Sequence, residues 1–124
     1  AMGLVVPPST VDVTLYQGAS FKHSFQWKYG ETLQTATAVD LTTASARAQV
    51  RKQFASATAY MSFTSVDGEI TLDDEGNIEI NVGPEKTALV PHGNAVWDLE
   101  IVWSDGDVCR LVHGKVTVSP EVTR

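Results

Sequence analysis

The sequence contains one cysteine, Cys109, and no long apolar run. A single cysteine excludes an intramolecular disulfide and any zinc site built from several cysteines. It is compatible with a reducing compartment. Every apolar run is shorter than the roughly 18 residues that a membrane-spanning helix needs. A basic region followed by an apolar stretch is also missing, so we expect neither a signal peptide nor a membrane partner.

Positive charge is scarce, with 9 Lys and Arg residues against 15 Asp and Glu residues and a formal net charge of −6. Affinity for a phosphate backbone depends on clustered cations, so we expect no nucleic-acid partner. The nearest approach to a basic patch is Arg47, Arg51 and Lys52. The composition, 43% hydrophobic and 19% charged, is that of an ordinary globular protein.

The first nine residues are expected to lie outside the folded domain. Ala1-Met2-Gly3 resembles the remnant of a cleaved expression tag. Pro7 and Pro8 favour an extended lead-in, because proline disrupts both helices and sheet ladders. The chain has no internal repeat and no low-complexity segment. We therefore predict a lead-in over residues 1–9 and a single β-sandwich domain over residues 10–124.

Apolar residues recur at every second position in eight short segments, which is the spacing of half-buried β-strands. Turn signals such as Asp67-Gly68 and Gly76-Asn77 separate them, as in a meander. Between residues 44 and 57 a helix is the competing interpretation, because good helix formers are frequent there, but the apolar spacing is two. The eight segments are residues 11–16, 21–28, 46–51, 59–63, 70–72, 78–82, 95–103 and 108–118.

These segments predict an all-β fold, an antiparallel two-sheet β-sandwich of the immunoglobulin-like type with about seven or eight strands. Pro84, a residue tolerated at the first position of a helix, predicts one short helical turn near residues 84–90. The expected core contains Phe21, Phe25, Trp27, Val50, Phe63, Ile70, Ile78, Ile80, Trp97, Leu99, Ile101 and Val116.

The acidic segment from Asp73 to Asn77 is the first candidate site, because its oxygen ligands suit calcium. An EF-hand loop has glycine at position six and a bidentate glutamate at position twelve. With Gly76 at position six, Val82 occupies position twelve, so the register fails. Asp, Gly and Asn are also the residues that tight turns select. We therefore predict a solvated turn and no metal site.

The three histidines and Cys109 are the next candidates. His23, His92 and His113 are scattered, and no HxH or HExxH spacing occurs. His23 shares a strand face with aromatic residues, which predicts a partly buried side chain. Strand alternation places His113 on the same face as Cys109, but no third group is in view to orient a Cys–His pair. We expect no nucleophile here.

The remaining candidates are two carboxylates and the tryptophans. Asp98 and Glu100 share the solvent face of one strand, whereas glycosidases set two carboxylates across a cleft. Trp27, Trp97 and Trp103 could stack on sugars, but each is in register with apolar neighbours, which predicts core packing. GxSxG, GxGxxG and phosphate-binding glycine loops are missing. The sequence therefore predicts no catalytic residue, no cofactor and no enzymatic activity.

Five stretches between residues 39 and 124 share a pattern of turn and core residues with a known family: 39–52 (VDLTTASARAQVRK), 68–72 (GEITL), 76–82 (GNIEINV), 97–100 (WDLE) and 114–124 (GKVTVSPEVTR). On these stretches, residues 39–124 resemble a structural module of phage and prophage virions. In members of that family the motif "DLTG-x-x-A-r-x-Q-I/V-R" comes first in the chain. The motifs "G-x-I-T-L", "G-x-h-x-h-x-h", "Y/W-D-L-E" and "G-x-V-x-V-S-P-E-V-T-R" come after it, in that order. Thr43 departs from the pattern, because family members commonly have glycine in that turn. The N-terminal module of phage baseplate upper proteins, a small β-sandwich, is similar.

The resemblance implies a virion structural or adaptor protein of the tail, baseplate or head–tail region, made in the bacterial host cytoplasm. It brings no catalytic residue. The expected partners are other virion proteins or further copies of the chain. A carbohydrate-binding sandwich that assists host adhesion is the alternative, and a prophage regulatory product is a third option. Docking is expected at a sheet edge, because the stretch from Thr32 to Ala38 carries no protecting charge, whereas Pro7 and Pro8 shield the first edge.

Overall fold

The computed structural model describes residues 9–29 and 37–121. The predictions for the tag remnant, for Pro7 and Pro8 and for the segment from Thr32 to Ala36 lie outside the described residues. Within the described ranges, no helix is long and apolar enough to cross a membrane.

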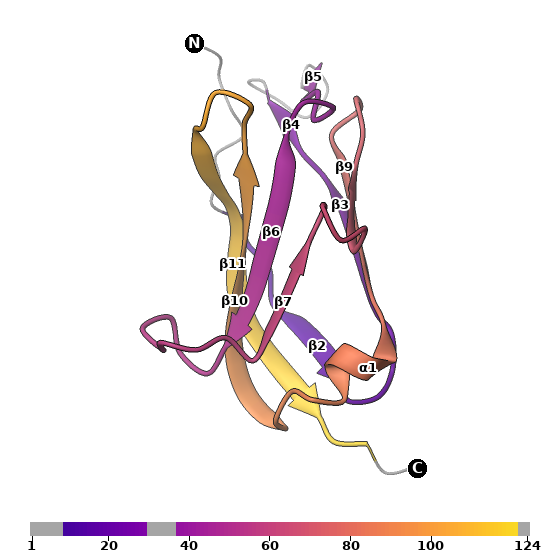
Figure 1. The fold of residues 1–124 in the computed structure, drawn as a ribbon, viewed down its shortest axis with the longest axis vertical. Helices are drawn as coiled ribbons and strands as arrows, with labels where there is room; N and C mark the ends of the chain where they lie inside the picture. Colours follow the sequence, from indigo (N-terminus) through magenta and orange to yellow (C-terminus); the bar gives the residue numbers. More distant parts are fainter. Residues whose placement is uncertain (1–8, 30–36, 122–124) are drawn as a thin grey trace.

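The larger of two packed sheets has six strands, in the order β1-β11-β10-β6-β7, with β2 also paired to β11 (Figure 1). Its central strands are the longest, and the polar sides of β11, β10, β6 and β7 form one outer face. The strands are β1 (Ser9–Thr10), β2 (Val13–Tyr16), β6 (Ser45–Arg51), β7 (Met61–Thr64), β10 (Gly93–Val102) and β11 (Val108–Ser119).

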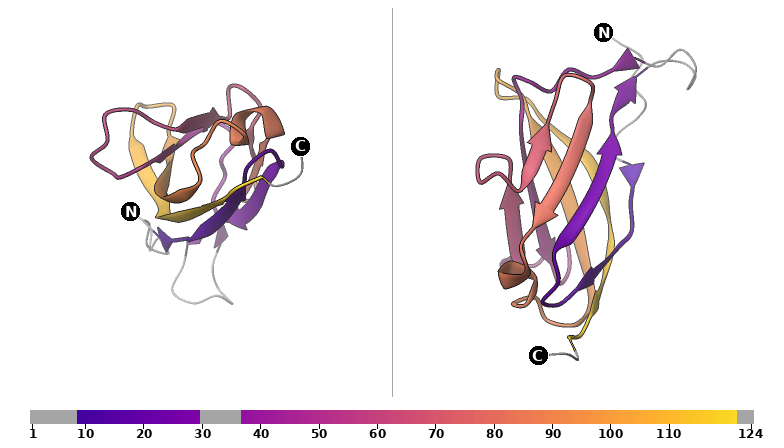
Figure 2. Two further views of the ribbon diagram at one scale, coloured as in Figure 1. Left: turned by 90° about the horizontal axis from the view of Figure 1, so that it is seen from below. Right: turned by 90° about the vertical axis from the view of Figure 1, so that its right-hand side faces the viewer.

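The smaller sheet, in the order β3-β9-β8, packs face to face against the first and lies toward the viewer in the right-hand view of Figure 2. A two-stranded ribbon of β4 and β5 extends one end of the molecule, and a single helical turn, α1, follows β9. These elements are β3 (Phe21–Gln26), β8 (Ile70–Leu72), β9 (Asn77–Val82), β4 (Lys28–Tyr29), β5 (Thr37–Ala38) and α1 (Pro84–Thr87).

The predicted all-β sandwich is confirmed. Each of the eight strands of three or more residues in the described ranges overlaps one of the eight predicted segments, with ends that differ by one or two residues at most positions. The segment at 45–51 is a strand, as its two-residue spacing indicates, and not the competing helix. The helical turn at Pro84 is also confirmed. One feature differs from an antiparallel sandwich, because β1 and β2 pair with β11 in parallel.

Eleven of the twelve residues predicted for the core are buried, and the other, Phe25, is half-buried. Phe25 lies on β3, an edge strand that has a hydrogen-bonded neighbour on one side. The core also takes residues from connecting segments that have no two-residue spacing, among them Leu41 and Val90, both 0% exposed.

The first predicted strand is interrupted at Val11 and Asp12, where the chain passes closely over β11. The carbonyl of Val11 accepts a hydrogen bond from the indole Nε1 of Trp97 at 2.8 Å. Asp12 Oδ1 accepts one from the backbone N–H of Lys115 at 2.9 Å. Gly114 lies directly beneath, and any Cβ at this position would overlap the carbonyl group of Val11. A glycine is therefore required at this crossing.

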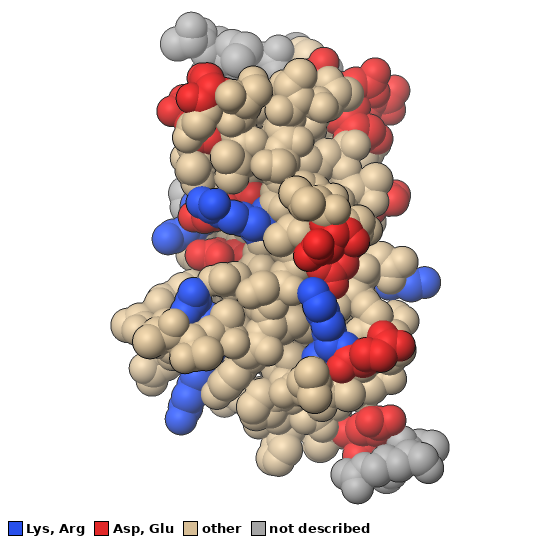
Figure 3. All heavy atoms as spheres, viewed as in Figure 1, with Lys and Arg blue, Asp and Glu red and all other residues tan. Residues whose placement is uncertain are grey.

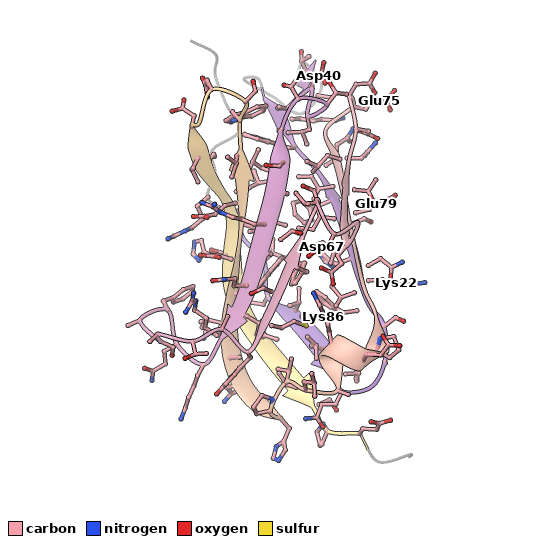
Figure 4. All side chains as sticks on the ribbon, viewed as in Figure 1. Lys22, Asp40, Asp67, Glu75, Glu79 and Lys86 are labelled. Atoms are coloured by element: carbon pink, nitrogen blue, oxygen red, sulfur yellow. The ribbon has the colours of Figure 1, made fainter. Side chains whose placement is uncertain are left out.

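The edge strand β7 is covered by the protein's own side chains. Lys86, on α1, donates a hydrogen bond to the carbonyl of Ser62 at 2.8 Å and forms an ion pair with Glu69 at 2.8 Å (Figure 4). The backbone N–H of Glu69 donates to the carbonyl of Thr64 at 3.0 Å. Such cover blocks the addition of a foreign strand. Of the proposed docking edge, Thr37 and Ala38 pair with β4.

Candidate functional site

The acidic turn between β8 and β9 is held together by one carboxylate. Asp73 Oδ1 accepts hydrogen bonds from the backbone N–H groups of Glu75 and Asn77, at 2.8 and 2.9 Å, and Oδ2 accepts one from Asn77 Nδ2 at 2.9 Å. These bonds, led by those from Asn77, lower the pKa of Asp73 below its usual value. Gly76 adopts a φ of 76°, which favours glycine. The predicted turn is confirmed.

We expect the melting temperature of the protein to be unchanged by excess EDTA or by millimolar calcium. Both oxygens of Asp73 already accept hydrogen bonds within the turn, and calcium needs six to eight oxygen ligands. Thermal unfolding followed by circular dichroism measures the effect. A rise of several degrees with calcium would contradict the expectation, because a ligand that binds the native state must stabilise it.

Cys109 and His113 lie on opposite faces of β11, so the prediction that they share a face is wrong. Cys109 pairs with Ile101 and His113 pairs with Asp98, but Leu111 is an extra residue opposite the step from Leu99 to Glu100. This β-bulge reverses the alternation. Cys109 is half-buried on the core side, and burial raises the pKa of its thiol. A raised pKa and the separation from His113 both count against a nucleophile.

The other histidines and the tryptophans do not form a common site. His23 is half-buried beside Phe25, with ring centroids 5.9 Å apart, as its strand face predicted. His92 is exposed in the connection before β10. Trp27 and Trp97 are 5% and 1% exposed, and the half-buried Trp103 packs against Trp27 at 5.9 Å. The described residues contain no group of three or more His, Cys, Asp or Glu side chains that could hold a metal ion.

The outer side of the six-stranded sheet, which we name the charged face, brings ionisable side chains from three strands into rows. The central strand β10 contributes the carboxylates Asp98 and Glu100. Strand pairing places Glu100 between Arg110 and Arg47, and Asp98 between His113 and Gln49. Across β11, β10, β6 and β7 the rows are Lys115–Val96–Arg51, His113–Asp98–Gln49–Ser62 and Arg110–Glu100–Arg47–Thr64.

Two ion pairs connect the strands of the charged face. Arg47 Nε lies 2.9 Å from Glu100 Oε1, and Arg110 Nε lies 3.6 Å from Asp98 Oδ2. Partial burial, with a contribution from the charge of Glu100, raises the pKa of Asp98, while Arg110, Arg51 and His113 act in the opposite direction. The burial of Asp98 therefore opposes its ionisation, and the surrounding cations favour it.

A loop overhangs one side of the charged face and makes it concave. Arg51 donates a hydrogen bond to the carbonyl of Ser56 at 2.6 Å, which fixes the connection between β6 and β7. Phe54, in this connection, is 55% exposed. Its ring meets the ring of His113 edge-on, with the two ring centroids 6.3 Å apart. Hollows of about 370 and 110 Å³ lie on either side of Asp98 and Gln49, which line both. Polar and charged side chains make up most of the lining of both hollows, whereas small-molecule sites are lined predominantly by apolar side chains.

The sequence shows the parts of the charged face but not their assembly. Arg47 and Arg51 belong to the nearest approach to a basic patch, and Asp98 and Glu100 alternate with apolar residues on a solvent face. Nothing in the chain indicates that β6 pairs with β10, about fifty residues away, and so brings these opposite charges together. The contribution of Arg110 depends on the bulge at Leu111.

Comparisons with known proteins find no match to a protein-family model and no match among curated proteins. Among solved structures, CopC from Methylosinus trichosporium OB3b is similar over 100% of this chain and 99% of that chain, with 13% sequence identity and a TM-score of 0.45. Drosophila OTK, extracellular domains 3–5, is similar over 98% of this chain and 36% of that chain, with 8% identity and a TM-score of 0.34. Both likenesses are too distant to bear on function.

Proposed function

We propose that this chain is a non-enzymatic structural or adaptor protein of a phage virion, in the tail, baseplate or head–tail region, and that it acts by docking to other proteins. The observation that carries the proposal is the charged face. It is an open surface with cross-strand ion pairs and one exposed aromatic side chain, Phe54, beside it. Protein interfaces are enriched in arginine and aromatic residues in this way. The virion setting rests on the resemblance of residues 39–124 to phage structural modules.

Contacts through a face fit this structure better than addition of a strand to the edge of the larger sheet. The edge at β7 is occupied by Lys86 and Glu69, whose hydrogen bonds engage its carbonyl groups. The charged face instead presents two arginine side chains that are 55% and 54% exposed, Arg47 and Arg110. Exposed guanidinium groups bind carboxylates of a partner with defined geometry.

The alternative, a carbohydrate-binding sandwich, receives less support from the aromatic residues. Sugar platforms are flat aromatic rings open to solvent, whereas Trp27 and Trp97 are buried and Trp103 packs against Trp27. Phe54 is the exposed aromatic residue nearest to the polar hollows and would have to serve as such a platform. A glycan array is therefore a useful second measurement.

The direct test is to ask whether the chain is part of purified particles. Virions banded by density from the bacterium that encodes the chain should contain it at a constant ratio to the major capsid protein, measured by quantitative mass spectrometry. Gold-labelled antibodies should place it at one position on the particle. Absence from banded virions, together with specific binding on the glycan array, would contradict the proposal and favour the carbohydrate alternative.

A further inference from the structure

Charge is distributed unevenly over this protein. The charged face carries four cations, Arg47, Arg51, Arg110 and Lys115, and two carboxylates, so it is positive by two formal charges. The whole chain is negative by six. Most of the negative charge of the chain therefore lies outside the charged face.

Part of this negative charge lies at one end of the sandwich, where Figure 3 shows Asp and Glu side chains in groups on both sides. Asp74 and Glu75 are exposed in the β8–β9 turn, and Asp105 and Asp107 are exposed in the β10–β11 turn. Asp40, just after β5, lies at the same end as Glu75 (Figure 4). We name these five residues the acidic end.

The charged face presents hydrogen-bond donors that are available to the carboxylates of a partner. Arg47 and Arg110 meet Glu100 and Asp98 through Nε, and among the described residues the terminal nitrogens of both guanidinium groups have no hydrogen-bond partner. Arg51, in contrast, donates from both terminal nitrogens, to the carbonyl of Ser56 and to Gln49 Oε1. A free guanidinium fork matches a carboxylate with two parallel hydrogen bonds. The pair Arg47 and Arg110 is therefore where acidic side chains of a partner would bind.

We propose that the occupant of the charged face is a second copy of this chain, docked through its acidic end. The proposal deepens the proposed function and rests on it. The basis of the proposal is the opposite charge of the two surfaces. The same chain presents a positive face, on which two arginines have unpaired terminal nitrogens among the described residues, and a negative end with exposed carboxylates. Phe54, exposed at the rim of the face, supplies an apolar anchor for such a contact.

The two surfaces differ, so the contact is heterologous. One lies on the broad outer side of the larger sheet and the other at an end of the sandwich (Figures 1 and 3). After two copies have bound, one of them keeps an unused end and the other an unused face. Contacts of this kind close into a ring or continue as a filament. The association must also weaken with salt, because exposed charges are screened over about 10 Å at roughly 0.1 M ionic strength.

Sedimentation velocity of the purified chain tests the contact. We expect oligomers at about 50 mM salt that dissociate at about 500 mM. The face variant Arg47→Glu with Arg110→Glu should be monomeric at both, and so should the end variant Asp74→Lys with Glu75→Lys. A 1:1 mixture of the two should form dimers, because the intact charged face of the end variant then meets the intact acidic end of the face variant. Circular dichroism melting shows that each variant is folded.

The matched control reverses a cation that belongs to neither surface, Lys22→Glu on β3, and should assemble like the wild type. A monomer at about 50 mM salt and roughly 100 µM protein, or an oligomer that the face variant leaves intact, would overturn the inference. Binding of polyglutamate or of a sulfated glycan to the face of a monomeric wild type would also overturn it. A chain that is monomeric yet present in banded virions refutes the second-copy contact and leaves the proposed function standing. Salt-sensitive assembly by a chain that is absent from virions refutes the proposed function and leaves the second-copy contact standing.

Discussion

Leu99→Ala is expected to lower the free energy of unfolding by about 2–5 kcal/mol. Leu99 is 0% exposed and lies on β10, the strand that pairs with both β11 and β6. Its strand neighbours Val112 and Ala48 are buried as well. The substitution removes apolar contacts and leaves a cavity that these well-ordered strands cannot collapse to fill. Urea unfolding followed by tryptophan fluorescence measures the loss.

Leu89→Ala is the matched control, because Leu89 is 79% exposed in the connection after α1. Its cost should stay within about 0.5 kcal/mol. A cost below about 1 kcal/mol for Leu99→Ala would mean that the faces of β10 are exchanged, since a slip of one residue moves every inward side chain outward. The charged face would then be assigned to the wrong side of the sheet as well.

Gly114→Ala should destabilise the protein by about 3 kcal/mol, which is large for the addition of one methyl group. The new Cβ would overlap the carbonyl of Val11, and a backbone carbonyl cannot rotate away as a side chain can. Relief requires the crossing segment to move. The movement would lengthen the hydrogen bonds from Trp97 Nε1 to Val11 and from Lys115 to Asp12. Differential scanning calorimetry and urea unfolding measure the cost.

Gly83→Ala provides the comparison. Gly83 has an extended backbone, with φ −69° and ψ 160°, and the nearest atoms to its added Cβ belong to the flexible carboxylate of Glu85. The change should be neutral within about 0.5 kcal/mol. Equal costs at the two positions would show that the close approach of Val11 to β11 does not constrain residue 114.

The positions of the strands and the inward residues could be predicted from local pattern. Phe63, Ile78 and Ile101 are buried as their two-residue spacing indicates, because a strand that covers a core must alternate its side chains. The turn at Asp73 was equally visible, because its bonds to Glu75 and Asn77 are local. Features that depend on a few neighbouring residues can therefore be predicted from the sequence.

The sequence alone thus determined the all-β sandwich, the short helical turn and the inward set of side chains. Only the tertiary structure decided three further features: the bulge at Leu111, the crossing of Val11 over Gly114 and the charged face. The bulge separates Cys109 from His113 and places Arg110 opposite Glu100. Each of these features depends on which distant strands pair and in which register, and hydrophobic periodicity is the same for every choice of partner.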